Sequence, residues 1–125
     1  MKRVLKTGGK LVIIDMEARE EGLRTTADTY ERLRDPSHVR CLSRREIAGL
    51  VEKFQMSLDF CQTIRIPVAL EAWMDVTRTE EPIRKTIRAA MQEELANGKK
   101  TGFAPFVQEG NIYFYHKWML VIAIK

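Results

Sequence analysis

The segment DPSHVR, residues 35–40, contains two side chains that are well suited to chemistry in this sequence of 125 residues. Histidine ionises near neutral pH, so His38 can act as a base or bind a substrate. The alternative is a loop histidine that bonds to backbone groups. Arg40 presents a planar fork that can grip an acidic group, or it forms an ordinary surface ion pair.

Asp15 and Tyr30 are the other two candidates for a binding site. Asp15 ends the apolar run LVIID, and ligands of open α/β sheets bind beyond the carboxyl ends of strands. It either faces such a site or caps the loop that follows. Tyr30 either lines a pocket or packs on a short helix. We therefore predict substrate-binding residues at Asp15, Tyr30, His38 and Arg40, and assign no catalytic residue.

Other chemical motifs are missing from the sequence. His38 and His116, with the distant Cys41 and Cys61, lack metal-ligand spacing, so we assign no metal. There is no G-x-S-x-G elbow, P-loop or C-x-x-C. No G-x-G occurs either, so no Gly-rich phosphate or cofactor loop is expected.

Composition favours one folded domain spanning residues 1–125, because 45% of the residues are hydrophobic, and the alternation of helices and strands makes it α/β. No apolar run reaches membrane-spanning length, and the basic start lacks the apolar core of a signal peptide. We therefore expect a cytoplasmic protein with reduced cysteines. The net charge is +4, and a loose arginine cluster extends over residues 32–45. Because the cluster lacks interleaved aromatics, a solvated surface is favoured over a nucleic-acid site.

Periodicity predicts alternating helices and strands. Ser43 and Glu46 have the spacing of a capping box, and Pro67 is expected to stop a strand. Thr79 is expected to cap a helix that ends at Gly98. The run LVIID reads as a strand buried on both faces. The expected elements are a helix end at 1–6, strands at 11–15, 56–66 and 111–125, and helices at 26–33, 43–54, 69–77 and 79–97.

Three motifs carry a resemblance to a known family: RVLKTGGKLVIID, DPSHVRCLSRREIAGLVEKF, and TGFAPF followed by YFYHKWMLVIAIK. In this order and spacing they resemble the carboxyl-terminal half of a class I S-adenosylmethionine-dependent methyltransferase of the ubiquinone/menaquinone-biosynthesis-like group. Thr7 stands where that family usually has proline. The resemblance implies a Rossmann-like sheet whose strands five, seven and six lie in this chain, with the antiparallel seventh strand between the other two.

The resemblance also implies that the amino-terminal half, which holds the S-adenosylmethionine cofactor, is missing. The chain would then be inactive alone and bind no cofactor, while keeping part of a pocket for a small-molecule methyl acceptor near His38. The fifth strand would have an unpaired edge, so we expect a homodimer or a separate amino-terminal half as partner. The alternatives are a non-catalytic binding or assembly module, and less favoured, a nucleic-acid binder through the arginine cluster.

Overall fold

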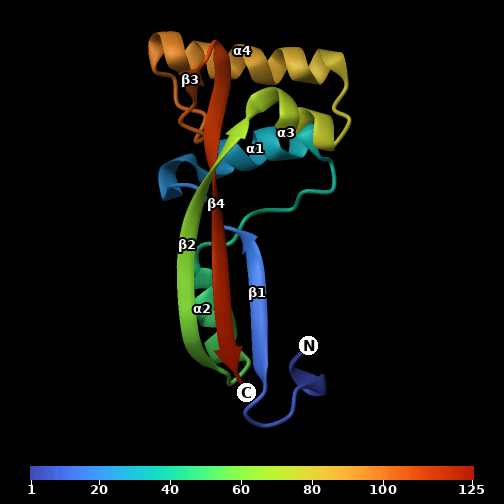
Figure 1. The fold of residues 1–125 in the computed structure, drawn as a ribbon, viewed down its shortest axis with the longest axis vertical. Helices are drawn as coiled ribbons and strands as arrows, with labels where there is room; N and C mark the ends of the chain where they lie inside the picture. The colour runs from blue at the N-terminus through green and yellow to red at the C-terminus, as the bar shows by residue number, and fades with distance from the viewer. The chain divides into compact units, whose positions relative to one another are not determined.

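The computed structural model describes residues 1–125, which form four strands, four α-helices and two short 3-10 helices (Figure 1). By their contacts these residues divide into two compact units. The strand unit comprises Met1–Ala18, Cys41–Arg65 and Lys117–Lys125, and the helical unit comprises Arg19–Arg40 and Ile66–His116. The elements in chain order are η1 (Lys2–Val4), β1 (Lys10–Met16), η2 (Glu21–Leu23), α1 (Arg24–Arg34), α2 (Arg44–Lys53), β2 (Ser57–Ala69), α3 (Leu70–Val76), α4 (Glu81–Asn97), β3 (Phe106–Gln108) and β4 (Asn111–Ile124).

The sheet has the order β1-β4-β2, with the last strand of the sequence in the middle. β4 pairs antiparallel with β1, from Lys10 opposite Ile124 to Met16 opposite Trp118. In the strand unit, β1 and β2 run in one direction and β4 in the other (Figure 1). This confirms the predicted α/β class and the order of strands five, seven and six. The short strand β3, which the sequence did not predict, adds a fourth strand by pairing with β4.

Helix α2 covers one face of the sheet in the strand unit, and its start is the predicted capping box. The Glu46 backbone N–H donates to Ser43 Oγ at 3.2 Å, and the Ser43 N–H donates to Glu46 Oε2 at 2.8 Å. Ile47 and Val51 then lie on the buried side of the helix. They pack against residues of β4, namely Met119, Val121 and Ala123.

The expectation that β1 is buried on both faces is wrong for this chain. Leu11 and Ile13 point toward α2, whereas Val12 and Ile14 are 55% and 67% exposed. The covered face of β1 is the one that packs against α2. The turn before β1 uses Gly8 as the sequence predicts. Gly8 has the left-handed φ of +76° that glycine permits, and its N–H donates to the Lys125 carbonyl at 2.8 Å.

Two of the predicted boundaries are also wrong. β2 continues through Pro67 to Ala69, because β2 lies at the end of the strand order and an edge strand tolerates a missing N–H. Helix α4 takes Glu80 as its N-cap, not Thr79. The Thr79 hydroxyl instead contacts Thr77 Oγ1 at 2.8 Å. At the other end of α4, Gly98 adopts the predicted left-handed stop with φ +73°.

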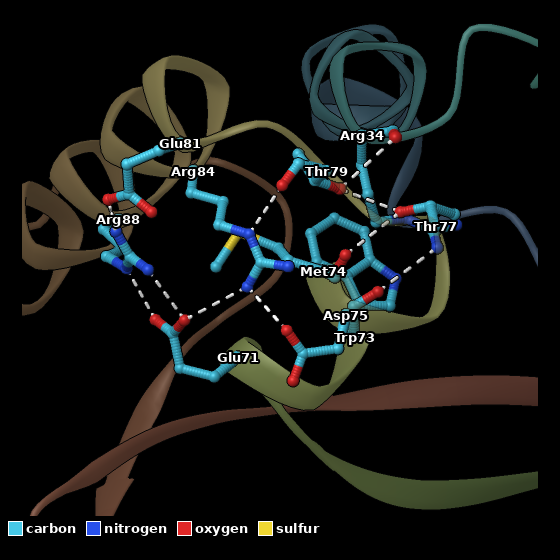
Figure 2. A network of polar contacts seen from close by, with 10 residues as sticks. All are labelled: Arg34, Glu71, Trp73, Met74, Asp75, Thr77, Thr79, Glu81, Arg84 and Arg88. Atoms are coloured by element: carbon cyan, nitrogen blue, oxygen red, sulfur yellow. Dashed lines mark hydrogen bonds and ion pairs between the residues drawn. The ribbon is translucent and has the colours of Figure 1, made fainter.

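The helical unit has its own apolar core, and polar contacts hold α3 against α4 over it (Figure 2). Arg84 of α4 donates from Nε to the Thr79 carbonyl at 2.7 Å and pairs with Asp75 of α3 at 2.7 Å. Arg88 holds both oxygens of Glu71, at 2.6 and 2.8 Å. The core beneath consists of Ala27, Leu70, Trp73, Met74, Ile87, Met91, Phe103 and Phe114. No helix of the chain is long and apolar enough to cross a membrane.

We expect Arg84→Met to lower the free energy of unfolding by about 1.5–3 kcal/mol, the range for hydrogen bonds to charged groups. The Arg84 side chain is only 15% exposed and donates to the carbonyl of buried Thr79, whereas its ion-pair partner Asp75 is 67% exposed and contributes less. Urea denaturation followed by circular dichroism measures the change. Lys85→Met is the matched control, since Lys85 is exposed on the same helix. Equal stability of the two variants would contradict a structural role for the Arg84 contacts.

Candidate functional site

The candidate site lies in the helical unit, where a tight turn after α1 folds His38 back onto the helix. Asp35 Oδ1 accepts the Ser37 N–H at 3.0 Å and the Ser37 hydroxyl at 2.6 Å. These bonds hold the pKa of Asp35 below its usual value. The His38 N–H then donates to the Asp35 carbonyl at 2.9 Å. This Asp-Pro-Ser-His turn therefore fixes the position of His38 through local hydrogen bonds.

His38 and Asp28 form a close pair inside this turn. His38 Nε2 lies 2.9 Å from Asp28 Oδ1, and the two side chains are only 10% and 11% exposed. A carboxylate that accepts the Nε2–H orients the ring and leaves Nδ1 as the second acid–base position. The pair has the geometry of a base with its orienting carboxylate.

A second polar pair, Glu31 and Arg34, lies on the same helix. Glu31 Oε2 is 3.3 Å from Arg34 Nη2, and the side chains are 5% and 10% exposed. Burial raises the pKa of Glu31 above its usual value, although the charge of Arg34 opposes the shift. The Arg34 guanidinium stacks on Trp73, with Cζ 4.5 Å from the ring centroid. Arg34 Nε and Trp73 Nε1 are buried without a hydrogen-bond partner in the protein.

Aromatic rings pack beside these polar groups. Trp73, Phe103 and Phe114 contact one another edge-on or tilted, with centroids 5.1–5.4 Å apart. Arg19 lies over Phe103 at 4.8 Å, and its Nη1 donates to the Tyr115 carbonyl at 2.6 Å. The helical unit thus combines a buried aromatic cluster with two arginine side chains that stack on its rings.

His116 is the second histidine of this unit and lies among the same rings. Its ring centroid is 5.2 Å from that of Phe114. Burial, and then the positive charges of Arg19 and Arg34, lower the pKa of His116 to about 4. His116 is therefore neutral near pH 7 and belongs to the core.

The four predicted binding residues differ in their placement. His38 is half-buried in the turn, and Tyr30 is half-buried on α1, where it meets Phe103 edge-on at 6.4 Å. Arg40 is exposed on the following loop. Asp15 is exposed at the end of β1 in the strand unit, and its Oδ1 accepts the Met16 N–H at 2.8 Å. The helical unit therefore contains Tyr30, His38 and Arg40, while Asp15 belongs to the other unit.

Sequence reasoning missed Asp28, Glu31 and Arg34, the polar residues that accompany His38. The available signal was their spacing on α1, because Asp28 and Glu31 are three positions apart and share a face with Ala27. Both acids are buried, at 7% and 4% exposure. The sequence of α1 shows no apolar periodicity, because the buried side of this helix itself carries charged residues. The buried face could therefore not be recognised from hydrophobic spacing.

A cofactor cradle for S-adenosylmethionine does not fit the residues of this chain. Such a cradle needs a Gly-rich loop after a strand, with backbone N–H groups free for the ligand. Gly8 and Gly9 precede β1, and both N–H groups are used, by the carbonyls of Lys125 and Lys6 at 2.8 Å. The glycine pair is therefore a structural turn.

The comparisons with known proteins point to methyltransferases. The protein YafE of Escherichia coli K12 is 30% identical over 105 residues, which cover 83% of this chain and 50% of YafE. YcgJ of Bacillus subtilis 168, a methyltransferase by name, is 29% identical over 125 residues, 98% of this chain and 49% of YcgJ. No family model matches the chain.

Solved structures agree with the sequence relatives. The YcgJ crystal structure superposes with a TM-score of 0.81 and 26% identity, over 98% of this chain and 53% of YcgJ. A protein from Bacillus halodurans C-125 that is assigned as a methyltransferase gives a TM-score of 0.84 at 22% identity, over 98% of this chain and 58% of its own. At that identity the second likeness supports the fold alone.

The fold is therefore that of a class I methyltransferase, with the final antiparallel strand between its two neighbours. More particularly, the chain corresponds to the carboxyl-terminal half of an S-adenosylmethionine-dependent methyltransferase of this class, as its motifs predicted. It spans about half the length of the curated relatives that it matches. The ubiquinone/menaquinone-like group remains a prediction.

We expect the melting temperature to fall as the pH is lowered from about 6.5 to 4, partly because of His116. Its folded pKa of about 4 is below the usual 6.5, so the unfolded chain binds the proton first and stability is lost across this window. The pKa of Glu31 is raised in the folded protein, so its protonation at lower pH stabilises the fold and opposes the effect of His116. Thermal melts of wild type and His116→Phe between pH 7 and 5 test this. A smaller decline in the variant is expected, and parallel curves would contradict it.

Proposed function

We propose that this chain is the acceptor-side part of an S-adenosylmethionine-dependent methyltransferase that acts on a small molecule, and that it is inactive alone. The observation that carries the proposal is the match over 98% of the chain, by sequence and fold, to YcgJ. The match extends over the His38 turn and the helices around it. The cofactor in this class is S-adenosylmethionine, which supplies the methyl group; its binding is assigned to the part of the fold outside these residues.

The chemistry available in the helical unit supports an acceptor role. A methyl acceptor such as a hydroxyl or an amine must lose a proton, and a positioned base assists this loss. The side chains of His38 and Asp28 are only 10% and 11% exposed, and the Asp35 turn fixes the position of His38. We infer that His38 Nδ1 takes the proton of the acceptor, while Asp28 holds the ring and stabilises its charged form.

One neighbouring group supports an anionic acceptor. Arg40 is exposed on the loop that carries His38, and its planar guanidinium can pair with an acidic group. Tyr30 adds a half-buried phenol beside Phe103.

The arginine cluster gives little support to nucleic-acid binding. Arg32 donates to the Val39 carbonyl at 3.1 Å, and Arg34 is buried against Trp73. Arg44 donates to the Cys61 carbonyl at 2.7 Å. Three of the five cluster residues are thus engaged within their own units and do not form a free phosphate-binding surface.

We expect calorimetric titration of the purified chain with S-adenosylmethionine to show no binding, because Gly8 and Gly9 are used in a turn. A chimera with the amino-terminal half of YcgJ joined before Met1 should bind the cofactor. The chimera should also transfer a labelled methyl group to at least one member of a panel of small aromatic hydroxy acids and amines. One-to-one binding by the chain alone, or a folded chimera that binds no cofactor, would contradict the proposal.

In an active chimera we expect His38→Gln to lower kcat by about 100-fold or more, the usual contribution of a positioned base. Asp28→Asn should lower kcat less, because the ring remains but is oriented less firmly. Thr29→Ala is the control, being exposed on the same helix. A rise in KM with unchanged kcat would assign His38 to binding instead of proton transfer.

A further inference from the structure

The helical unit contains a pocket that lies apart from the His38 turn. Residues of α3, α4 and the start of β4 line it, together with the last residue of β2, and its volume is about 460 Å³. Pockets that hold small molecules have volumes of roughly 300–1,000 Å³, so this one has room for a ligand. None of its lining residues belongs to α1 or to the turn after α1. We call it the α3–α4 pocket.

The pocket is hollow because several of the residues around it are small. Ala69 and Ala72 contribute only methyl groups, and Gly110 has no side chain. Gly110 has φ +76° and follows Glu109 at φ +51°, which is the left-handed pair of a two-residue hairpin turn between β3 and β4. The hairpin therefore requires a residue without a side chain at this border of the pocket.

The apolar part of the lining belongs to the core of the helical unit. Leu70 is 1% exposed, and Ile112 packs against the same core cluster. Because core side chains are closely packed, the fold itself sets the shape of this part of the pocket. A charged group placed against it would lose its hydration, so this surface suits the C–H groups of a ligand.

The charged residues at the pocket are already engaged with one another (Figure 2). All three nitrogens of the Arg88 guanidinium donate hydrogen bonds, from Nε and Nη2 to the two oxygens of Glu71 at 2.6 and 2.8 Å and from Nη1 to Glu81 at 2.6 Å. The bonds to Glu71 and Glu81 raise the pKa of Arg88, and the bond to Arg88 lowers the pKa of Glu71. Arg88 is therefore committed to its own carboxylates and does not offer a cation to an acidic ligand.

The wider network has an excess of negative charge. Arg84 joins it through Glu71 at 3.6 Å and Asp75 at 2.7 Å, and Arg88 adds Glu81. Three carboxylates thus surround two guanidinium groups. A ligand with a carboxylate or phosphate group would be repelled at this position, so the charges favour a neutral ligand.

The other polar side chains at the pocket include two neutral amides. Gln92 is exposed on α4, and Asn111 is exposed at the start of β4, where its Nδ2 donates to the Glu109 carbonyl at 3.3 Å. A carboxamide both donates and accepts hydrogen bonds, and so does a hydroxyl group. Amides beside an apolar surface therefore match a ligand that carries several hydroxyl groups on a carbon ring.

We propose that the α3–α4 pocket binds a neutral sugar. The C–H groups of the ring lie against Leu70 and Ile112, and the hydroxyl groups bond to the amides of Gln92 and Asn111. The proposal goes beyond the proposed function and does not depend on it, because the pocket contains none of the residues assigned to methyl transfer.

NMR titration of the 15N-labelled chain with glucose, galactose, mannose and ribose tests the site. At least one sugar should give saturable shifts at the amides of residues 69–72 and 110–113, with a dissociation constant in the millimolar range that is usual for so small a ligand. Glucuronate, which adds a carboxylate to the ring of glucose, should bind about 10-fold more weakly than the best neutral sugar or not at all, because of the negative network.

Two variants locate the binding. Ala72→Trp fills the pocket from an exposed position and should abolish the shifts, and Gln92→Leu should weaken binding about 10-fold through the loss of a hydrogen bond. Ala89→Trp is the matched control, because Ala89 is exposed on α4 outside the lining. Circular dichroism shows whether each variant is folded.

The proposal is wrong if none of the four sugars gives saturable shifts, if folded Ala72→Trp binds like wild type, or if glucuronate binds as tightly as the neutral sugars. If Ala72→Trp does not fold, unchanged affinity in Gln92→Leu would overturn the site instead. No step of this test uses the chimera or methyl transfer, so a failure of the proposed function leaves its result unaffected.

Discussion

The structure depends on the antiparallel ladder that β4 forms with its neighbours. β4 pairs with β1 over seven positions and with β3 over three, and it separates β1 from β2 in the sheet. One strand therefore supplies backbone partners for the other three. It also contributes to both apolar cores, with Phe114 in the helical unit and Val121 in the strand unit, both fully buried. Because β1 and β4 lie far apart in the sequence, their ladder forms only when these two distant segments meet.

The helical unit shows how charged groups can be kept in a small core. Arg34 and Glu31 are buried as a pair, and the guanidinium spreads its charge over the face of Trp73. Burying such a pair contributes little stability, because desolvation offsets much of the attraction. Arg34 Nε and Trp73 Nε1, which are buried without a hydrogen-bond partner in the protein, add to the cost of this arrangement.

Sequence predicted those features whose cause is local. The capping box at Ser43 and the left-handed stop at Gly98 each need a particular residue within a few positions, and both are present. The predictions that were wrong concerned features that depend on residues far away in the sequence. Pro67 does not end β2, because no strand requires its missing N–H on the outer edge. His38 and Asp28 are ten positions apart, so their pairing requires the chain to fold back on itself. Hydrophobic periodicity does not predict such a turn.

The prediction for β1 failed for a different reason, and its failure is informative. An apolar run on both faces of a strand is the pattern of a sheet covered on two sides, yet Val12 and Ile14 are exposed here. Within these 125 residues the two side chains add almost nothing to the apolar core. Polar residues at positions 12 and 14 would cost little stability in the contacts described, and they would protect the strand from pairing with other chains. The pattern of β1 is therefore the one that a strand covered on both faces requires.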